Sequence, residues 1–313
     1  MNRAATGGSP TAPRSTLLLV VPAALLGVAI AWALAVPDPV QAEAPVRALA
    51  DCAGAVVLGL AALPRLHDRL TPPWRPLAAL GGLWAATEFV VLAYEAAQVV
   101  GVRVTELRAA DFGTYLTRVS GGQIGIAIGV GTLVVTGYAA LAYRRPERAS
   151  ADPVVVFAAV ALVLRPITGH MSQQPLGSVL GALHALAAAA WFGLLVALTL
   201  VVRTRGEWAA VLPRYSAWAL PAAATVAVTG VCNGLVRVRG LTPLVDTGYG
   251  RILLAKSALV LALLLLGWWW RRTWVPRAAD HRLTAESSLR RAVGEVVAMA
   301  VVFGLAATLA VTA

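Results

Sequence analysis

The sequence predicts an all-α, polytopic bundle of transmembrane helices. Of its 313 residues, 59% are hydrophobic and only 13% are charged, whereas a soluble domain carries about a quarter charged residues. Apolar runs of about twenty residues recur along the whole chain, and each is long enough to cross a bilayer. The 10 tryptophans and 28 glycines are typical of interfacial anchors and of helices that pack closely in lipid. The lipid bilayer is therefore the first predicted partner.

We predict about nine membrane spans. They cover residues 16–36, 46–63, 77–100, 120–142, 153–170, 177–202, 215–236, 250–270 and 290–311. The first four form an N-terminal membrane region within residues 1–150, and the other five form a second region within 151–313. The first span ends in Ala33-Leu34-Ala35, which resembles a signal-peptidase site, but its length favours a retained helix. Residues 101–119 mix charged and apolar side chains and are expected to contain a short interfacial helix.

The arginines predict the orientation of the bundle. With the N-terminus inside, the inner segments hold 17 arginines and the outer segments hold 8. Because cytoplasmic loops carry the excess of basic residues, this bias favours an inner N-terminus and an outer C-terminus. The net charge of +11 lies mostly in these short loops, so it indicates topology and not nucleic-acid binding. The two cysteines fall within predicted spans and imply no disulfide framework. The oligomeric state stays open.

Two histidines lie where the fifth and sixth predicted spans meet. His170 and Met171 are at the outer end of the fifth span, and His184 comes one to two turns into the sixth. Imidazole binds copper, zinc or iron, whereas a thioether selects Cu(I). Small residues recur every four positions from Gly177 to Gly193, which predicts that His184 lies beside a helix contact. We predict a metal site of His170, His184 and an inward-turned Met171. The alternative is a hydrogen-bonded interior His184 and a solvated His170.

Polar side chains within the apolar runs form a second set of candidates. Glu88 and Glu95 are seven positions apart and share one face of the third span. Asn233 ends a polar face of the seventh span, while Lys256 and Glu295 lie over a turn into the eighth and ninth spans. Such groups face the bundle interior or reach toward the interface, and they form buried pairs or mark an ion or proton path. We favour the path for the set taken together.

Five segments in the C-terminal half resemble the copper resistance protein D (CopD) family. They are the Gly-His pair at 169–170, LHALAAAAWFGLLVAL, RYSAWALPAAATVAVTGVCNG, YGRILLAKSALVLALLLL and LRRAVGEVVAMAVVFGLAATLA. The resemblance covers residues 167–313 and rests on the order of the five segments. Where the family has two glycines after the tryptophan, this chain has Phe192-Gly193 after Trp191. The resemblance implies that five residues belong to family motifs: His170, His184, Tyr249, Lys256 and Glu295.

The resemblance implies copper uptake across the cytoplasmic membrane, with the copper ion as the bound metal. A separate, extracytoplasmic copper-binding protein of the CopC type is an expected partner. Copper would be captured near His170 and His184 and would move inward past Asn233 and the intramembrane acids. Two alternatives stay open: a b-type-cytochrome-like electron carrier with haem between the two histidines, and an assembly factor that delivers copper to an oxidase. No nucleophile–base pair has supporting spacing, so we expect no enzyme activity.

Overall fold

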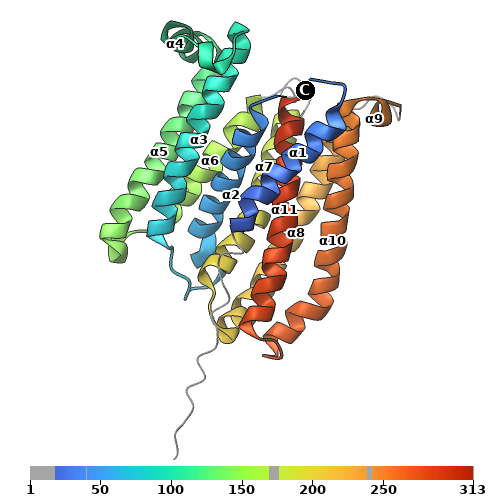
Figure 1. Cartoon of the computed structure of the whole chain (residues 1–313). Coiled ribbons are helices and arrows are strands. Elements are labelled where there is room, and N and C mark those ends of the chain that lie inside the picture. Colours follow the sequence, from blue (N-terminus) through green and yellow to red (C-terminus); the bar gives the residue numbers. More distant parts are fainter. Residues whose placement is uncertain (1–17, 40, 169–175, 238–241, 313) are drawn as a thin grey trace, which may run out of the picture.

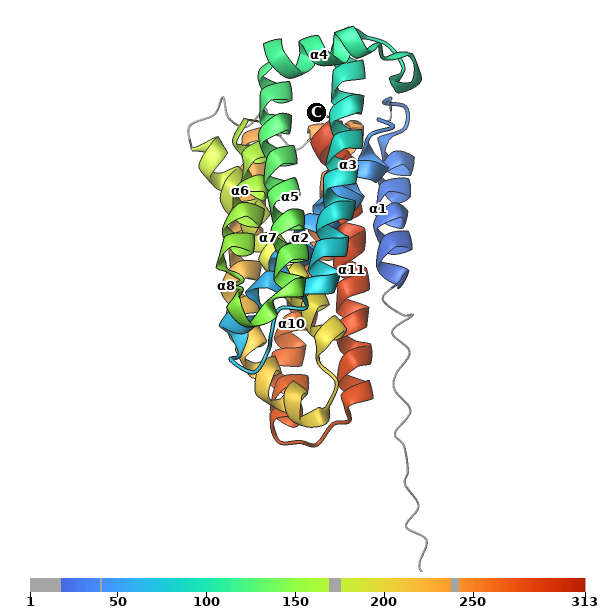
Figure 2. The ribbon, with the colours of Figure 1, turned by 90° about the vertical axis from the view of Figure 1, so that its left-hand side faces the viewer.

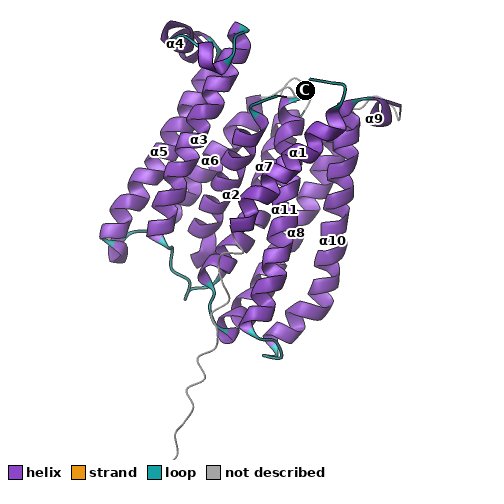
Figure 3. Cartoon of the chain, viewed as in Figure 1, coloured by secondary structure: helices purple, strands orange, loops and turns teal. Residues whose placement is uncertain are grey.

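A computed structural model describes residues 18–39, 41–168, 176–237 and 242–312, and these ranges are helical without any strand (Figure 1, Figure 3). The predicted all-α bundle is therefore confirmed. The helices are α1 (Val20–Ala35), α2 (Ala44–Leu66), α3 (Trp74–Val100), α4 (Ala109–Arg118), α5 (Ser120–Arg144), α6 (Asp152–Thr168), α7 (Gly177–Val201), α8 (Arg205–Arg237), α9 (Thr242–Asp246), α10 (Gly248–Ala279) and α11 (Ala285–Val311). Two short 3-10 turns, η2 (Val104–Glu106) and η3 (Pro146–Arg148), complete the described elements.

Seven of these helices are long and apolar enough to cross a membrane: α2, α3, α5, α7, α8, α10 and α11. The apolar α1 has 16 residues and α6 has 17. These nine helices correspond to the nine predicted spans, although the number that crosses the bilayer stays a prediction. Large apolar side chains such as Leu83, Leu133 and Leu261 are exposed on the outside of the bundle. A bilayer covers such a surface.

Two helices are longer than the sequence predicted. We expected spans at 215–236 and 250–270, but α8 has 33 residues and α10 has 32. At 1.5 Å per residue, α10 measures about 48 Å, against about 30 Å of hydrocarbon. Hydropathy marks where the apolar side chains end, whereas the backbone hydrogen bonds continue through solvated residues. The basic segment 271–279, expected as loop, is therefore helical, and only five residues connect α10 to α11.

The long helices alternate in direction through the bundle (Figure 1, Figure 2). Helices α3, α5 and α6 lie on one side, α1, α10 and α11 lie on the other, and α2 and α7 pack together between them. The connections predicted as outer therefore lie at one end of the bundle and those predicted as inner at the opposite end. The predicted short helix within 101–119 is present as α4, which packs on the end of α3 through Tyr115. Which end faces the cytoplasm stays a prediction.

Glycines bring the backbones of α2 and α7 into direct contact. A Cβ added to Gly193 would lie 1.8 Å from the carbonyl oxygen of Ala55, and one added to Gly59 would lie 2.0 Å from the Gly193 carbonyl carbon. Helices α1 and α11 approach in the same way, because a Cβ on Gly27 would lie 2.2 Å from the Val301 oxygen. Small residues allow such close packing where lipid supplies no hydrophobic driving force. The proposed division at residue 150 stays a prediction, and α2 packs tightly against α7 across it.

Candidate functional site

Arg165 occupies the centre of a group of buried charges. It lies in the last turn of α6, where its Nη2 is 2.5 Å from Glu88 Oε2 and its Nη1 pairs with Glu95 Oε1. The indole of Trp84 donates to Glu88 over 3.1 Å, and the Tyr115 hydroxyl donates to Glu95 over 3.3 Å. Burial, and then the nearby Glu95, raise the pKa of the Tyr115 phenol, so the phenol keeps its proton. The predicted common face of the two glutamates is confirmed.

The group continues onto the start of α2. Arg47 Nη1 lies 3.3 Å from Glu43 Oε1 and 3.7 Å from Glu95 Oε1. Gln98 donates to Glu43 over 3.2 Å, and Glu43 is only 1% exposed. Burial raises the pKa of Glu43 although Arg47 opposes that shift. The paired cluster comprises Glu43, Arg47, Glu88, Glu95 and Arg165. Each of its charges has an opposite charge within 4 Å.

Asp51 lies one turn beyond Arg47 on α2 and was not predicted as a site residue. Its carboxylate interacts electrostatically with Arg47, Glu88 and Arg165, and also with Lys256 on α10. It therefore stands between the paired cluster and the polar residues of the C-terminal half. A lone acid six residues into an apolar run is visible in the sequence. Intramembrane acids are functional candidates by default, and this one could have been found.

His184 is half-buried on α7 and bonds to α8. Its Nδ1 lies 2.8 Å from Thr229 Oγ1, and the Thr229 hydroxyl donates to the Thr225 carbonyl oxygen over 2.5 Å. A hydroxyl carries one proton, so Thr229 accepts from His184. This assigns the neutral tautomer with the proton on Nδ1 and leaves a lone pair on Nε2. The predicted interior position of His184 is confirmed, and its free ring nitrogen could bind a metal ion.

Asn233 lies one turn beyond Thr229 on α8. Its Oδ1 is buried and accepts no hydrogen bond within the described parts of the chain. A buried carbonyl oxygen without a partner is costly and calls for water, an ion or a ligand. Lys256 on α10 interacts electrostatically with both Asp51 and His184. No carboxylate lies within 4 Å of its Nζ among the residues that the structure describes.

Glu295 lies toward the other end of the bundle and is 5% exposed. The Trp191 side chain of α7 is within hydrogen-bonding reach of its carboxyl group. The Tyr215 hydroxyl donates to the Trp191 carbonyl oxygen over 3.3 Å and interacts electrostatically with Glu295. Met299 is buried one turn further along α11. Glu295 therefore lies among aromatic side chains and has no ion pair within the described ranges.

The candidate residues fall into three places. Glu88 and Glu95 belong to the paired cluster; His184, Asn233 and Lys256 line the interior of the C-terminal half; Glu295 lies separately near its other end. Tyr249 lies in the first turn of α10 and packs beside Ile252 against α1. His170 and Met171 lie outside the described residues, so their relation to His184 stays a prediction. Within the described ranges, no three His, Cys, Asp or Glu side chains gather as metal ligands.

Two protein families match the sequence. Copper resistance protein D-like, N-terminal domain, matches residues 14–177, and copper resistance protein D, CopD, matches residues 209–309. The first match alone covers more than half of the chain. It ends at the first residue of α7, whereas we predicted a boundary near residue 150. The second match includes the proposed motif residues Tyr249, Lys256 and Glu295.

Two curated proteins are similar over part of their length. Copper transport protein CutJ of Bacillus subtilis (strain 168) is 31% identical over 126 residues, which are 37% of this chain and 23% of that protein. Inner membrane protein YebZ of Escherichia coli (strain K12) is 33% identical over 139 residues, which are 41% of this chain and 47% of that protein. The matched region spans less than half of either relative. No solved structure matches the chain significantly.

Proposed function

The chain belongs to the copper resistance protein D family of membrane proteins, and from this premise we propose that it carries copper from the outer face of the cytoplasmic membrane toward the cytoplasm. A copper-related, multi-pass membrane protein follows from the family and the apolar helices. The transport step and its direction are our proposal. It is supported by the name of the similar CutJ, a copper transport protein, and by the polar residues inside the bundle.

The hydrogen bond between His184 and Thr229 is the observation that carries the proposal, because it occupies Nδ1 and leaves Nε2 as the ring nitrogen for a metal ion. Thr229 fixes the ring through Nδ1 over 2.8 Å, and hydrogen bonds of this kind orient metal-binding histidines. A neutral imidazole is a good ligand for copper. One ring nitrogen alone holds an ion weakly, so we propose that His170 and Met171 supply the other ligands. Weak and reversible capture suits a transporter, because the ion must also leave.

The route inward passes residues that could pass a cation along or move protons. Asn233 offers its unpartnered Oδ1 one turn beyond Thr229 on α8, and Lys256 on α10 interacts electrostatically with Asp51 on α2. Glu295 lies further along the same half of the bundle. We propose that this interior set comprises Asp51, His184, Asn233, Lys256 and Glu295. Lys256 would repel an incoming cation while charged, so its charge must be offset by Asp51 during transport.

Copper uptake into vesicles tests the proposal. We expect purified wild-type protein in sealed liposomes to accumulate copper and His184→Ala to lose most of the uptake. His281→Asn is the matched control, because His281 is exposed in the short α10–α11 connection at a positive φ of 56° that Asn tolerates. Equal uptake by wild type and His184→Ala would overturn the proposed entry site.

Two further measurements separate transport from the alternatives. An absorption spectrum of the purified protein with a strong Soret band would indicate a haem-binding electron carrier. Copper binding without vesicle uptake would indicate an assembly factor that delivers copper to an oxidase. We also propose that a CopC-like protein delivers copper to the outer end of the bundle. Copper-loaded CopC-type protein added outside the vesicles should then give faster uptake than the same amount of free copper.

A further inference from the structure

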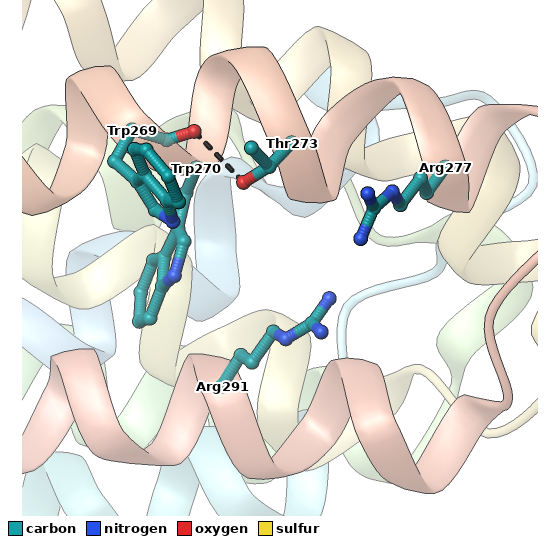
Figure 4. Close-up of a pocket in the computed structure, with 5 residues that line it drawn as sticks. All are labelled: Trp269, Trp270, Thr273, Arg277 and Arg291. Carbon is teal, nitrogen blue, oxygen red and sulfur yellow. Dashed lines mark hydrogen bonds between the residues drawn. The ribbon is translucent and has the colours of Figure 1, made fainter.

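Helices α10 and α11 line a pocket that is open to the outside of the bundle, near the short connection between them. It has a volume of about 300 Å³ and is lined by Trp269, Trp270, Thr273, Arg277 and Arg291 (Figure 4). The two indoles form one wall, and the two guanidinium groups extend into the space from opposite helices. The pocket lies at the opposite end of α10 from Tyr249. None of the residues proposed for copper transport lines it.

Both arginines of the pocket lack a partner. Across the described residues, neither the Arg277 nor the Arg291 guanidinium has a carboxylate within 4 Å or a hydrogen-bond acceptor. The neighbouring arginines differ: Arg271 donates to the Ser216 carbonyl oxygen over 2.7 Å, and Arg272 lies 4.1 Å from the centre of a Trp268 ring. Two guanidinium groups that face one space attract an anion more strongly than either does alone.

The nearby acids do not supply that anion. Asp280 lies 3.7 Å from Arg282 in the connection. Glu295 is one turn beyond Arg291 but is buried beside Trp191 on α7. The Thr273 hydroxyl donates to the Trp269 carbonyl oxygen over 2.9 Å, which leaves its lone pairs but no proton for a ligand. Both guanidinium groups are therefore available to an anionic ligand from outside the described residues.

An apolar surface leads from this pocket toward the middle of the bundle. Leu261 and Leu265 are exposed and precede Trp269 by eight and four positions, so the three side chains share one face of α10. Trp268 and Trp269 are exposed above the arginines, as expected for a belt at the membrane interface. A ligand that carries both a phosphate and an acyl chain would contact the basic pocket and the adjoining apolar face of α10. A soluble anion would contact the basic pocket alone.

We propose that Arg277 and Arg291 bind the phosphate of an anionic lipid headgroup, with an acyl chain lying along Leu261, Leu265 and Trp269. Guanidinium groups present several N–H donors in a fixed geometry that suits phosphate oxygens. Basic pockets between membrane helices are a known form of lipid headgroup site. This site is independent of copper, and it would hold α10 and α11 together at the end where only five residues connect them.

Native mass spectrometry of the full chain in detergent tests the site. The probe is phosphatidylglycerol, offered together with an equal amount of phosphatidylcholine of the same chain length. We expect wild type to retain phosphatidylglycerol preferentially, and Arg277→Gln/Arg291→Gln to lose about tenfold in that preference. The matched control is Arg282→Gln/Arg290→Gln, which removes the same charge from the same end of the bundle and should change the preference less than about twofold.

Three outcomes would overturn the lipid site. The first is equal retention of both lipids by wild type, and the second is an equal loss of the phosphatidylglycerol preference in the two double variants. The third is displacement of the lipid by millimolar inorganic phosphate, which would indicate that the site binds a soluble phosphoryl anion. Should the first double variant not fold, quenching of wild-type tryptophan fluorescence by headgroup-proximal brominated phosphatidylglycerol serves instead. That quenching should fall in Trp269→Phe and not in Trp218→Phe, whose exposed indole lies on α8. Equal quenching in both variants would reject the site.

Discussion

The paired cluster and the interior set differ in how their charged groups are paired. In the paired cluster, two arginines and three glutamates from α3, α6 and the N-terminal end of α2 each have an opposite charge within 4 Å. In the interior set, Lys256 and Glu295 have no such partner in the described ranges, and Asn233 Oδ1 accepts no hydrogen bond. A satisfied network fixes how helices dock, whereas an unsatisfied polar group costs stability and is kept for a function. The same residue types therefore pair in one group and lack close partners in the other, and it is for the second group that we propose a role in transport.

Removing the central cation of the paired cluster should have the largest effect on stability. Arg165→Gln leaves Glu88 and Glu95 buried without their shared guanidinium. Breaking a buried ion pair from one side costs about 3–5 kcal/mol, because the remaining charge is uncompensated. We expect a correspondingly large fall in the thermal unfolding temperature of the detergent-solubilised protein.

The control for Arg165 lies at the same end of the bundle. Arg103 pairs with Glu106, but its side chain is 82% exposed, so Arg103→Gln should cost less than about 1 kcal/mol. Neutralising the acids together with the arginine, in Glu88→Gln/Glu95→Gln/Arg165→Gln, should recover part of the lost stability. If Arg165→Gln were as mild as Arg103→Gln, the paired cluster would not hold the helices together.

The contact between α2 and α7 determines whether the two halves behave as one body. Gly193→Ala places a Cβ 1.8 Å from the Ala55 carbonyl oxygen, so the helices must separate. Overpacking costs about 1–3 kcal/mol, and we expect a lower unfolding temperature. Gly129→Ala on α5 is the control, since its Cβ would meet nothing within 4 Å. If Gly129→Ala lost as much stability as Gly193→Ala, the close contact between α2 and α7 would not be the cause of the loss.

The sequence predicted the bundle well because apolar length and small-residue spacing are local properties. It also predicted that Glu88 and Glu95 share a face and that His184 lies inside. It did not predict Arg165 as their partner, because a residue at the end of an apolar run looks like a loop residue until the helix is seen to include it. Which charges pair is decided by contacts between helices far apart in the sequence. That information is absent from hydropathy, as is the tautomer of His184.

The bond between Thr229 and His184 tests the interior set. Thr229→Val keeps the shape of the side chain but removes the acceptor for the Nδ1 proton, so the ring loses its orientation. Loss of a residue that orients a metal ligand typically weakens binding by about 10- to 100-fold, and we expect about tenfold weaker copper binding by titration. Thr229→Ser should restore binding, because it keeps the hydroxyl. If Val and Ser variants bound copper equally well, Thr229 would have a packing role only.

The smallest effect is expected at Glu43, where burial raises the pKa above its ordinary value of 4.5. An acid with a raised pKa stabilises the folded state fully below its unfolded pKa, and that contribution is lost as the pH rises through the folded pKa. Glu43→Gln resembles the protonated form and keeps one oxygen acceptor for Arg47 or Gln98. We expect the variant to match wild type near pH 4.5 and to gain relative stability, by less than about 1 kcal/mol, as the pH rises to 8. Thermal unfolding of both proteins across this range measures the difference. A variant that instead loses most stability at pH 8 would show that the ion pair with Arg47 outweighs burial, and the paired cluster would then be fully ionised.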